Sequence, residues 1–90
     1  MLVITGVSCI KNTPNPIVGE VYIVHDTGFT TWKIIDIKDT EIYYIPNDYQ
    51  VSEKQLIDSI NNSENYTDTP IIISREDFQK KQNLQLLNLN

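Results

Sequence analysis

The sequence predicts a single α+β domain: a three-stranded antiparallel meander, one further strand and two short helices. β-branched and aromatic residues are concentrated between Val18 and Ile45, and turn-forming residues cut this run at Asp26–Gly28 and Lys38–Thr40. Isoleucine occurs fourteen times and alanine is absent. Because β-branched side chains lose χ1 freedom in helices and pack well on a pleated surface, this composition favours a sheet. The meander can also curl into a small half-open barrel of the SH3-like kind.

The domain boundaries follow from length and composition. Ninety residues are enough for one domain. Residues 1–16 read as an apolar segment followed by a Pro/Asn linker, and residues 17–90 read as the α+β domain. The linker is predicted from Lys11–Pro16, where two prolines and two asparagines stand together. Proline withholds a backbone donor and biases its predecessor to extended geometry.

The first strand is expected from Val18 to His25, with Val21 and Ile23 on one face and Tyr22 on the other. The residues Asp26-Thr27-Gly28 then predict a hairpin turn, in which Gly28 would supply a positive φ.

The second strand is expected over Thr31–Ile37 and the third over Glu41–Ile45. Within the second strand the apolar parity switches between Ile34 and Ile35. Such a switch predicts a bulge, a strong bend or a strand covered on both faces.

The first helix is expected over Glu53–Asn61. Ser52 would cap the amide of Gln55, and Val51 would pack on Leu56 as a hydrophobic staple. The buried stripe of this helix would consist of Leu56, Ile57 and Ile60.

The same helix-start pattern recurs after Pro70–Ile73, which reads as a short buried strand at a sheet edge. Ser74 would cap a second helix running from Arg75 to about Leu84, with Asp77 at the third helical position. The periodicity of the leucine-rich tail that follows is ambiguous, so the tail is read either as an extension of the helix or as a frayed end.

Charge and cysteine content disfavour several functions. The net charge is −5, with one arginine and six scattered lysines. Nucleic-acid binders need clustered cations for phosphates, so nucleic acid is not an expected partner. Anionic membrane surfaces are disfavoured for the same reason. The single cysteine, Cys9, excludes an internal disulfide and a multi-cysteine zinc site. The sequence predicts no metal site and no cofactor.

No catalytic residues are predicted. Asp26-Thr27-Gly28 resembles the aspartic-protease triplet, but bulky Phe29 follows it and no glycine occurs after Gly28. A hairpin turn is the favoured interpretation. His25 cannot be oriented by Asp26, because neighbouring strand residues point to opposite faces.

Five aromatic residues are the best candidates for a binding surface: Tyr22, Trp32, Tyr43, Tyr44 and Tyr49. Tyrosine and tryptophan are favoured at interfaces because each is mostly apolar with one polar tip. On the meander, Tyr22 and Tyr43 are expected to share an exposed face. The alternative is that these aromatics cover the core of a small domain.

Cys9 bears on cellular location. The residues Gly6-Val7-Ser8-Cys9 resemble the lipobox of bacterial lipoproteins, although Gly6 departs from that pattern and no Lys or Arg precedes the cysteine. The resemblance implies acylation of Cys9 and an envelope location, given a longer leader upstream of Met1. In the alternative interpretation, Leu2–Val7 is a first strand and Cys9 is buried.

The sequence therefore predicts a small, non-enzymatic protein-interaction module of bacterial origin with an unknown partner. It would be lipid-anchored in the envelope through Cys9 or located in the cytoplasm. The alternative is a cytoplasmic adaptor, immunity-type or phage-encoded accessory protein, whose acidity would suit a basic partner.

Overall fold

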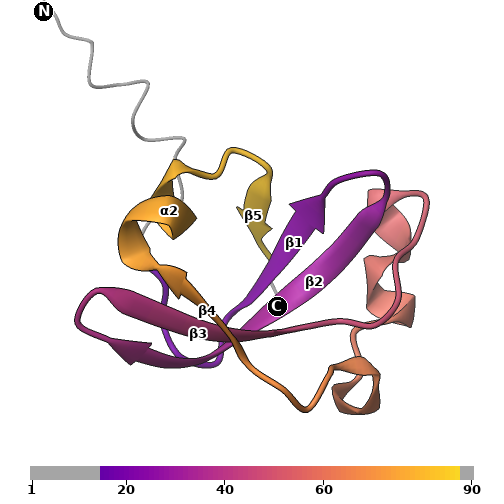
Figure 1. The fold of residues 1–90 in the computed structure, drawn as a ribbon. Helices are drawn as coiled ribbons and strands as arrows, with labels where there is room; N and C mark the ends of the chain where they lie inside the picture. Colours follow the sequence, from indigo (N-terminus) through magenta and orange to yellow (C-terminus); the bar gives the residue numbers. More distant parts are fainter. Residues whose placement is uncertain (1–14, 88–90) are drawn as a thin grey trace, which may run out of the picture.

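The computed structural model describes residues 15–87, which form one antiparallel five-stranded sheet in the order β4-β3-β2-β1-β5 (Figure 1). The predicted α+β class is confirmed. The strands are β1 (Val21–His25), β2 (Phe29–Lys38), β3 (Glu41–Pro46), β4 (Ile71–Ser74) and β5 (Leu84–Leu86). Two short 3₁₀ helices, η1 (Lys54–Ser59) and η2 (Ser63–Asn65), follow β3, and the α-helix α2 (Arg75–Lys80) joins β4 to β5.

The hairpin between β1 and β2 forms at Asp26–Gly28 as predicted, with His25 paired to Phe29. The reason for the glycine differs from the prediction. Gly28 has no positive φ; instead, a Cβ there would lie 2.8 Å from the carbonyl oxygen of Val51. Glycine is therefore required because the backbone of a distant segment approaches closely.

The parity switch in β2 is a β-bulge. The pairing register between β2 and β3 shifts between Ile34 and Asp36, which confirms the predicted irregularity. The bulge lets Ile34 and Ile37 both pack on the same core, although an odd spacing of three positions would put them on opposite faces of a regular strand.

The two edge strands differ from expectation. β4 lies at the edge of the sheet, as proline at its start predicts, but Ile71 and Ile72 are 43% and 53% exposed rather than buried. The second helix ends at Lys80, and the tail residues Leu84–Leu86 form β5 against the free edge of β1.

The segment expected to be the first α-helix is the 3₁₀ helix η1, and the predicted capping box does not form. Val51 instead makes an isolated bridge to Phe29, with N···O distances of 2.7 and 2.8 Å. This bridge holds Val51 in an extended conformation, and the helix begins one residue later than predicted, at Lys54. The N-cap is Glu53, without a side-chain hydrogen bond, and Leu56 is 45% exposed.

Hydrophobic clusters lie on both faces of the sheet. On the face covered by α2, called the α2 face, the buried cluster consists of Tyr22, Ile34, Ile42, Tyr44 and Phe78. On the opposite face, called the η1 face, Ile23 packs with Ile57 and Ile60. Because β1 lies between these clusters, four of its five residues are buried. Figure 1 shows α2 and the 3₁₀ helices at opposite ends of the sheet.

Candidate functional site

The five aromatic residues named from the sequence do not form one surface. Tyr22 is fully buried and Tyr44 is 7% exposed, so neither presents a broad surface to a partner. The expectation that Tyr22 and Tyr43 share an exposed face is wrong. Tyr22 pairs with Trp32, and Trp32 pairs with Pro46, so these three side chains lie on one face of the sheet. Because side chains alternate along β3, Tyr44 lies on this same face and Tyr43 lies on the opposite one.

Trp32 lies in an apolar surface on the α2 face, and the largely buried ring of Tyr44 supports it from below. Their rings stack with centroids 4.0 Å apart and an angle of 22° between the ring planes. Pro46, on β3, is the direct cross-strand neighbour of Trp32. Tyr22 links Trp32 to Leu86 of β5, which is 40% exposed.

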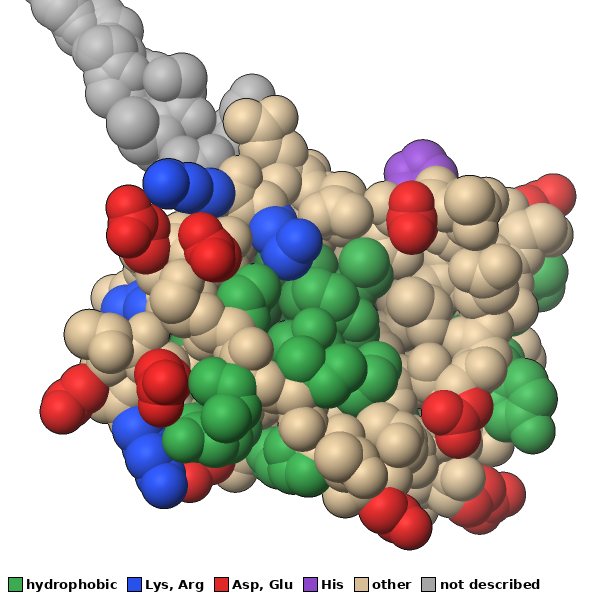
Figure 2. Space-filling model, in the orientation of Figure 1, with side chains coloured by type: hydrophobic (Ala, Val, Ile, Leu, Met, Phe, Trp, Pro, Cys, Tyr) green, Lys and Arg blue, Asp and Glu red, His purple; other side chains and the backbone are tan. Residues whose placement is uncertain are grey.

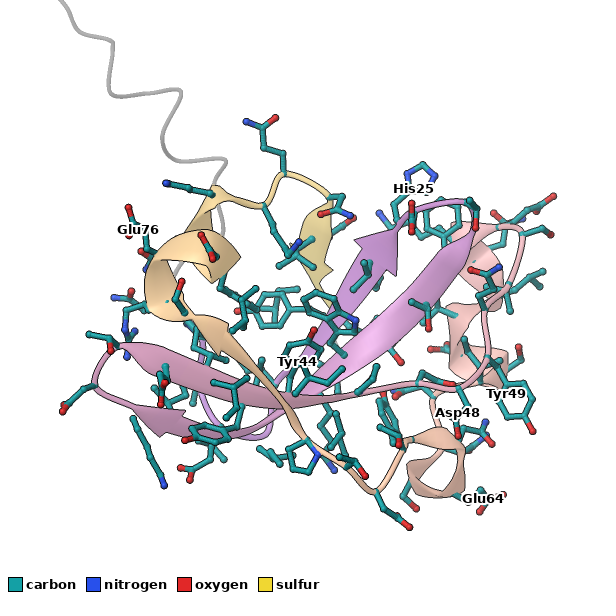
Figure 3. All side chains as sticks on the ribbon, viewed as in Figure 1. His25, Tyr44, Asp48, Tyr49, Glu64 and Glu76 are labelled. Atoms are coloured by element: carbon teal, nitrogen blue, oxygen red, sulfur yellow. The ribbon has the colours of Figure 1, made fainter. Side chains whose placement is uncertain are left out.

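We call this surface the aromatic patch: Trp32, Tyr44, Pro46, Leu84 and Leu86. Figure 2 shows hydrophobic side chains gathered in the middle of this face, and in the same view Figure 3 places Tyr44 at the centre. The patch therefore draws on β2, β3 and β5, strands that are distant in the sequence.

Tyr22 is fully buried and lies beneath the aromatic patch. Its ring packs edge-to-face on Phe78 of α2, with centroids 5.2 Å apart, and its hydroxyl donates to Glu20 Oε1 at 3.1 Å. Burial raises the pKa of Tyr22, and the Glu20 carboxylate raises it further. Burial also raises the pKa of Tyr44. Both phenols are therefore neutral at physiological pH.

One cation borders the aromatic patch. The Nζ of Lys81 lies 5.7 Å from the ring centroid of Trp32, within the range of a cation–π interaction. The neighbouring Lys80 instead forms an ion pair with Glu76 at 3.3 Å. Lys81 therefore gives the edge of the patch a positive charge that an acidic group on a ligand can use.

Tyr43 and Tyr49 lie elsewhere. Tyr43, on the opposite face, donates to Glu41 Oε1 at 3.3 Å, and Lys38 Nζ lies 5.1 Å from its ring centroid. Tyr49 is 58% exposed and lies in the segment after β3, well away from Tyr44 in Figure 3. Neither residue adds to the aromatic patch.

A buried polar network fastens the segment after β3 to the sheet. Asn47 Nδ2 donates to Thr31 Oγ1 at 3.1 Å and to the Ile60 carbonyl at 2.7 Å. The hydroxyls of Thr31 and Tyr66 lie 2.8 Å apart, and Tyr66 also donates to Asn61 Oδ1 at 2.6 Å. Burial raises the pKa of Tyr66. Sequence reasoning missed this network because its members are scattered polar residues with no periodicity.

The remaining polar candidates are not brought together. His25 ends β1 as expected, and its imidazole stacks on Phe29 with centroids 4.2 Å apart. Within residues 15–87, no group of three or more potential metal ligands occurs. Cys9 lies outside the described residues, so its acylation stays a prediction. No helix in the described chain is long and apolar enough to cross a membrane.

Comparison of the chain with protein-family models, with curated proteins and with solved structures finds no match.

Proposed function

We propose that this chain is a small non-enzymatic protein-interaction module and that the aromatic patch is its binding surface. The observation that carries this proposal is the exposure of Leu86 on the same face as the stacked Trp32–Tyr44 pair, on the part of the α2 face that α2 leaves uncovered. The ligand we propose is an apolar segment of another protein that carries a carboxylate close to Lys81.

The physical properties of the patch suit this role. Tryptophan offers a large contact area at a low cost in side-chain entropy and is enriched among residues that dominate binding energy. Trp32 stacks on Tyr44 and lies between its cross-strand neighbours Tyr22 and Pro46. A preorganised aromatic side chain binds without first having to be ordered, which lowers the cost of association.

The finer description of the fold is also a proposal. We infer that the sheet is a half-open barrel of the SH3-like kind. The bulge in β2 supports strong curvature, and α2 links the two edge strands while its Phe78 packs against Tyr22 near the middle of the sheet. In such a half-barrel the opening between β4 and β5 exposes the aromatic patch.

The cellular location remains a proposal that rests on Cys9. In the envelope, a lipid anchor at Cys9 would hold the domain at a membrane with the patch free to bind. The alternative is a cytoplasmic adaptor, immunity-type or phage-encoded accessory protein. The mass of the chain isolated from its own cells distinguishes them, because only an anchored chain gains acyl groups at Cys9.

Photo-crosslinking in the cells that express the chain tests the proposed binding surface. A photoreactive residue replaces Leu86 in one variant and Leu56, on η1, in a matched control, since the two side chains are 40% and 45% exposed. We expect a defined protein adduct from position 86, absent from position 56 and lost with Lys81→Glu. Equal adducts from both positions, or none from position 86, would rule the patch out.

A further inference from the structure

The open edge of β4 is an unpaired strand edge with an apolar surface. β4 pairs with β3 on one side, and within residues 15–87 no strand pairs with its other side. Ile71 and Ile72 are 43% and 53% exposed, and the stretch from Pro70 to Ser74 contains no charged residue. Exposed, uncharged edges are templates for pairing with a further strand, and proteins usually protect them.

The hydrogen-bonding groups on this edge are fixed by the pairing with β3. The Arg75 amide donates to the Thr40 carbonyl at 2.7 Å. Hydrogen-bonded pairs alternate along an antiparallel ladder, so Ile73 and Ile71 also bond to β3. Ile72 and Ser74 stand opposite Tyr43 and Glu41 at the positions in between, and their amides point outward. The carbonyls of Pro70 and Ile72 point outward by the same alternation.

We propose that β4 pairs with β4 of a second copy of this chain, antiparallel about a twofold axis at Ile72. In this register the amide and carbonyl of each Ile72 bond to the same groups of the other copy. The amide of Ser74 donates to the carbonyl of Pro70 in the second copy. Each outward donor on the edge thus meets an outward acceptor.

The irregular pattern of this edge favours a second copy over an arbitrary strand. In this register Pro70 stands opposite Ser74 of the second copy. Pro70 has no amide hydrogen, so it donates no hydrogen bond to the Ser74 carbonyl. Ser74 is the N-cap of α2, so its carbonyl already accepts the first hydrogen bond of the helix. An ordinary strand would place an unsatisfied donor at that position, whereas a second copy places Pro70 there.

The charges that flank β4 allow the same arrangement. Asp68 precedes β4 and Arg75 follows it, and no ion pair to either side chain occurs in the described part of the chain. Antiparallel pairing about Ile72 places Asp68 of each copy opposite Glu76 of the other, one residue beyond Arg75, whose Nε donates to the Asp39 carbonyl of its own chain at 3.0 Å. Glu76, next to Arg75, is already compensated by Lys80 at 3.3 Å. A contact made by one four-residue strand of each copy is smaller than the ~1,200 Å² at the lower end of standard complexes, so we expect a weak dimer.

Sedimentation equilibrium of the purified chain from ~10 µM to ~2 mM tests the proposal. We expect reversible dimerisation that Ile72→Lys weakens at least ~10-fold, because like charges would face each other across the axis. Ile72→Pro should do the same, because proline removes the outward amide hydrogen of residue 72. The matched control Leu56→Lys, at a side chain 45% exposed on η1, should leave dimerisation unchanged. Trp32 fluorescence confirms that each variant is folded.

A mixing experiment tests the register. Ile72→Glu should weaken self-association as Ile72→Lys does, because like charges again face each other across the axis, whereas an equimolar mixture of these two variants should associate as the wild type does. A chain that stays monomeric at all these concentrations would overturn the proposal. So would a dimer that Ile72→Lys and Ile72→Pro both leave intact, or a mixture no more associated than its components. The aromatic patch is not involved in this test, so its failure leaves the proposed function unaffected.

Discussion

Substitution of Asn47 by aspartate tests whether the buried polar network holds the segment after β3 on the sheet. Asn47 is 9% exposed; its Nδ2 donates to Ile60 and Thr31, and its Oδ1 accepts from the Tyr49 amide at 2.8 Å. Asn47→Asp preserves size and shape and keeps the acceptor for Tyr49. It replaces both donated hydrogen bonds by contacts between oxygen atoms.

The expected loss of unfolding free energy is about 2–4 kcal/mol. Leaving a buried partner unsatisfied costs about 1–3 kcal/mol for each hydrogen bond. We expect less than the full cost of two lost hydrogen bonds, because both former partners of Asn47 retain another one. The Ile60 carbonyl still accepts from Asn65 Nδ2 at 3.0 Å, and the Thr31 hydroxyl stays within 2.8 Å of the Tyr66 hydroxyl. For so small a domain, this is a large part of a total stability of about 5 kcal/mol.

The loss should depend on pH with a defined sign. Burial and the facing oxygen atoms raise the pKa of the introduced carboxyl above its unfolded value of about 3.9. The protonated carboxyl can donate to the Ile60 carbonyl, so the variant approaches the wild type below the unfolded pKa. The difference grows as the pH rises through the folded pKa.

Urea unfolding followed by the fluorescence of the single tryptophan, Trp32, measures both quantities. The matched control is Asn62→Asp, at an exposed asparagine, which should change the unfolding free energy by less than ~0.5 kcal/mol. The reasoning is refuted if Asn47→Asp is as stable as this control at neutral pH, or if its deficit is the same at about pH 3.5.

Three further predictions use the same unfolding assay. Phe78→Ala should cost about 3–5 kcal/mol because the ring is fully buried against Tyr22, while Glu76→Ala on the same helix should cost less than ~0.5 kcal/mol; equal effects would contradict the packing of α2. Ser74→Ala should cost about 1 kcal/mol, since Ser74 Oγ accepts from the Asp77 amide at 3.0 Å, and Ser52→Ala should cost close to nothing. A loss on Ser52→Ala as large as that on Ser74→Ala would restore the capping box. Burial raises the pKa of three tyrosines, so their contribution to stability is complete below about pH 10 and is lost as the pH rises through the raised values; Tyr22→Phe should reduce this alkaline loss, and an unchanged loss would contradict it.

The two serine motifs show what the sequence can and cannot predict. Both carry a cap followed by an acceptor at the third helical position, yet only Ser74 caps a helix. At Ser52 the local signal is overridden by a tertiary contact, because both backbone groups of Val51 bond to Phe29. Phe29 is 22 residues earlier in the chain, so nothing near Ser52 indicates this contact.

β1 and β5 illustrate the same limit. Side-chain alternation correctly predicts that Tyr22 lies on the opposite face of β1 from Val21 and Ile23. It does not predict that Phe78, more than fifty residues later in the chain, covers the Tyr22 face. β5 carries leucines rather than β-branched residues and is only three residues long. It becomes a strand because β1 offers a free edge, so no local pattern indicates it.

The candidate site was therefore only partly predictable. Trp32 and Tyr44 were named from composition, and they do stack on one face. Leu86 and Lys81 were missed because they reach the patch only once α2 and β5 have packed on the sheet. The bulge in β2, by contrast, was visible in the sequence, since a change of parity within a strand is a local property.

Acrylamide quenching of Trp32 fluorescence, in the free chain and in the complex with the protein cross-linked at position 86, tests the central claim most directly. Trp32 is the only tryptophan of the chain and lies partly exposed in the aromatic patch, so a partner without tryptophan, or with its tryptophans replaced, leaves its signal unobstructed. If the patch is the binding surface, the complex should protect Trp32 from the quencher. Quenching that is equally efficient in the free chain and the complex would contradict the claim.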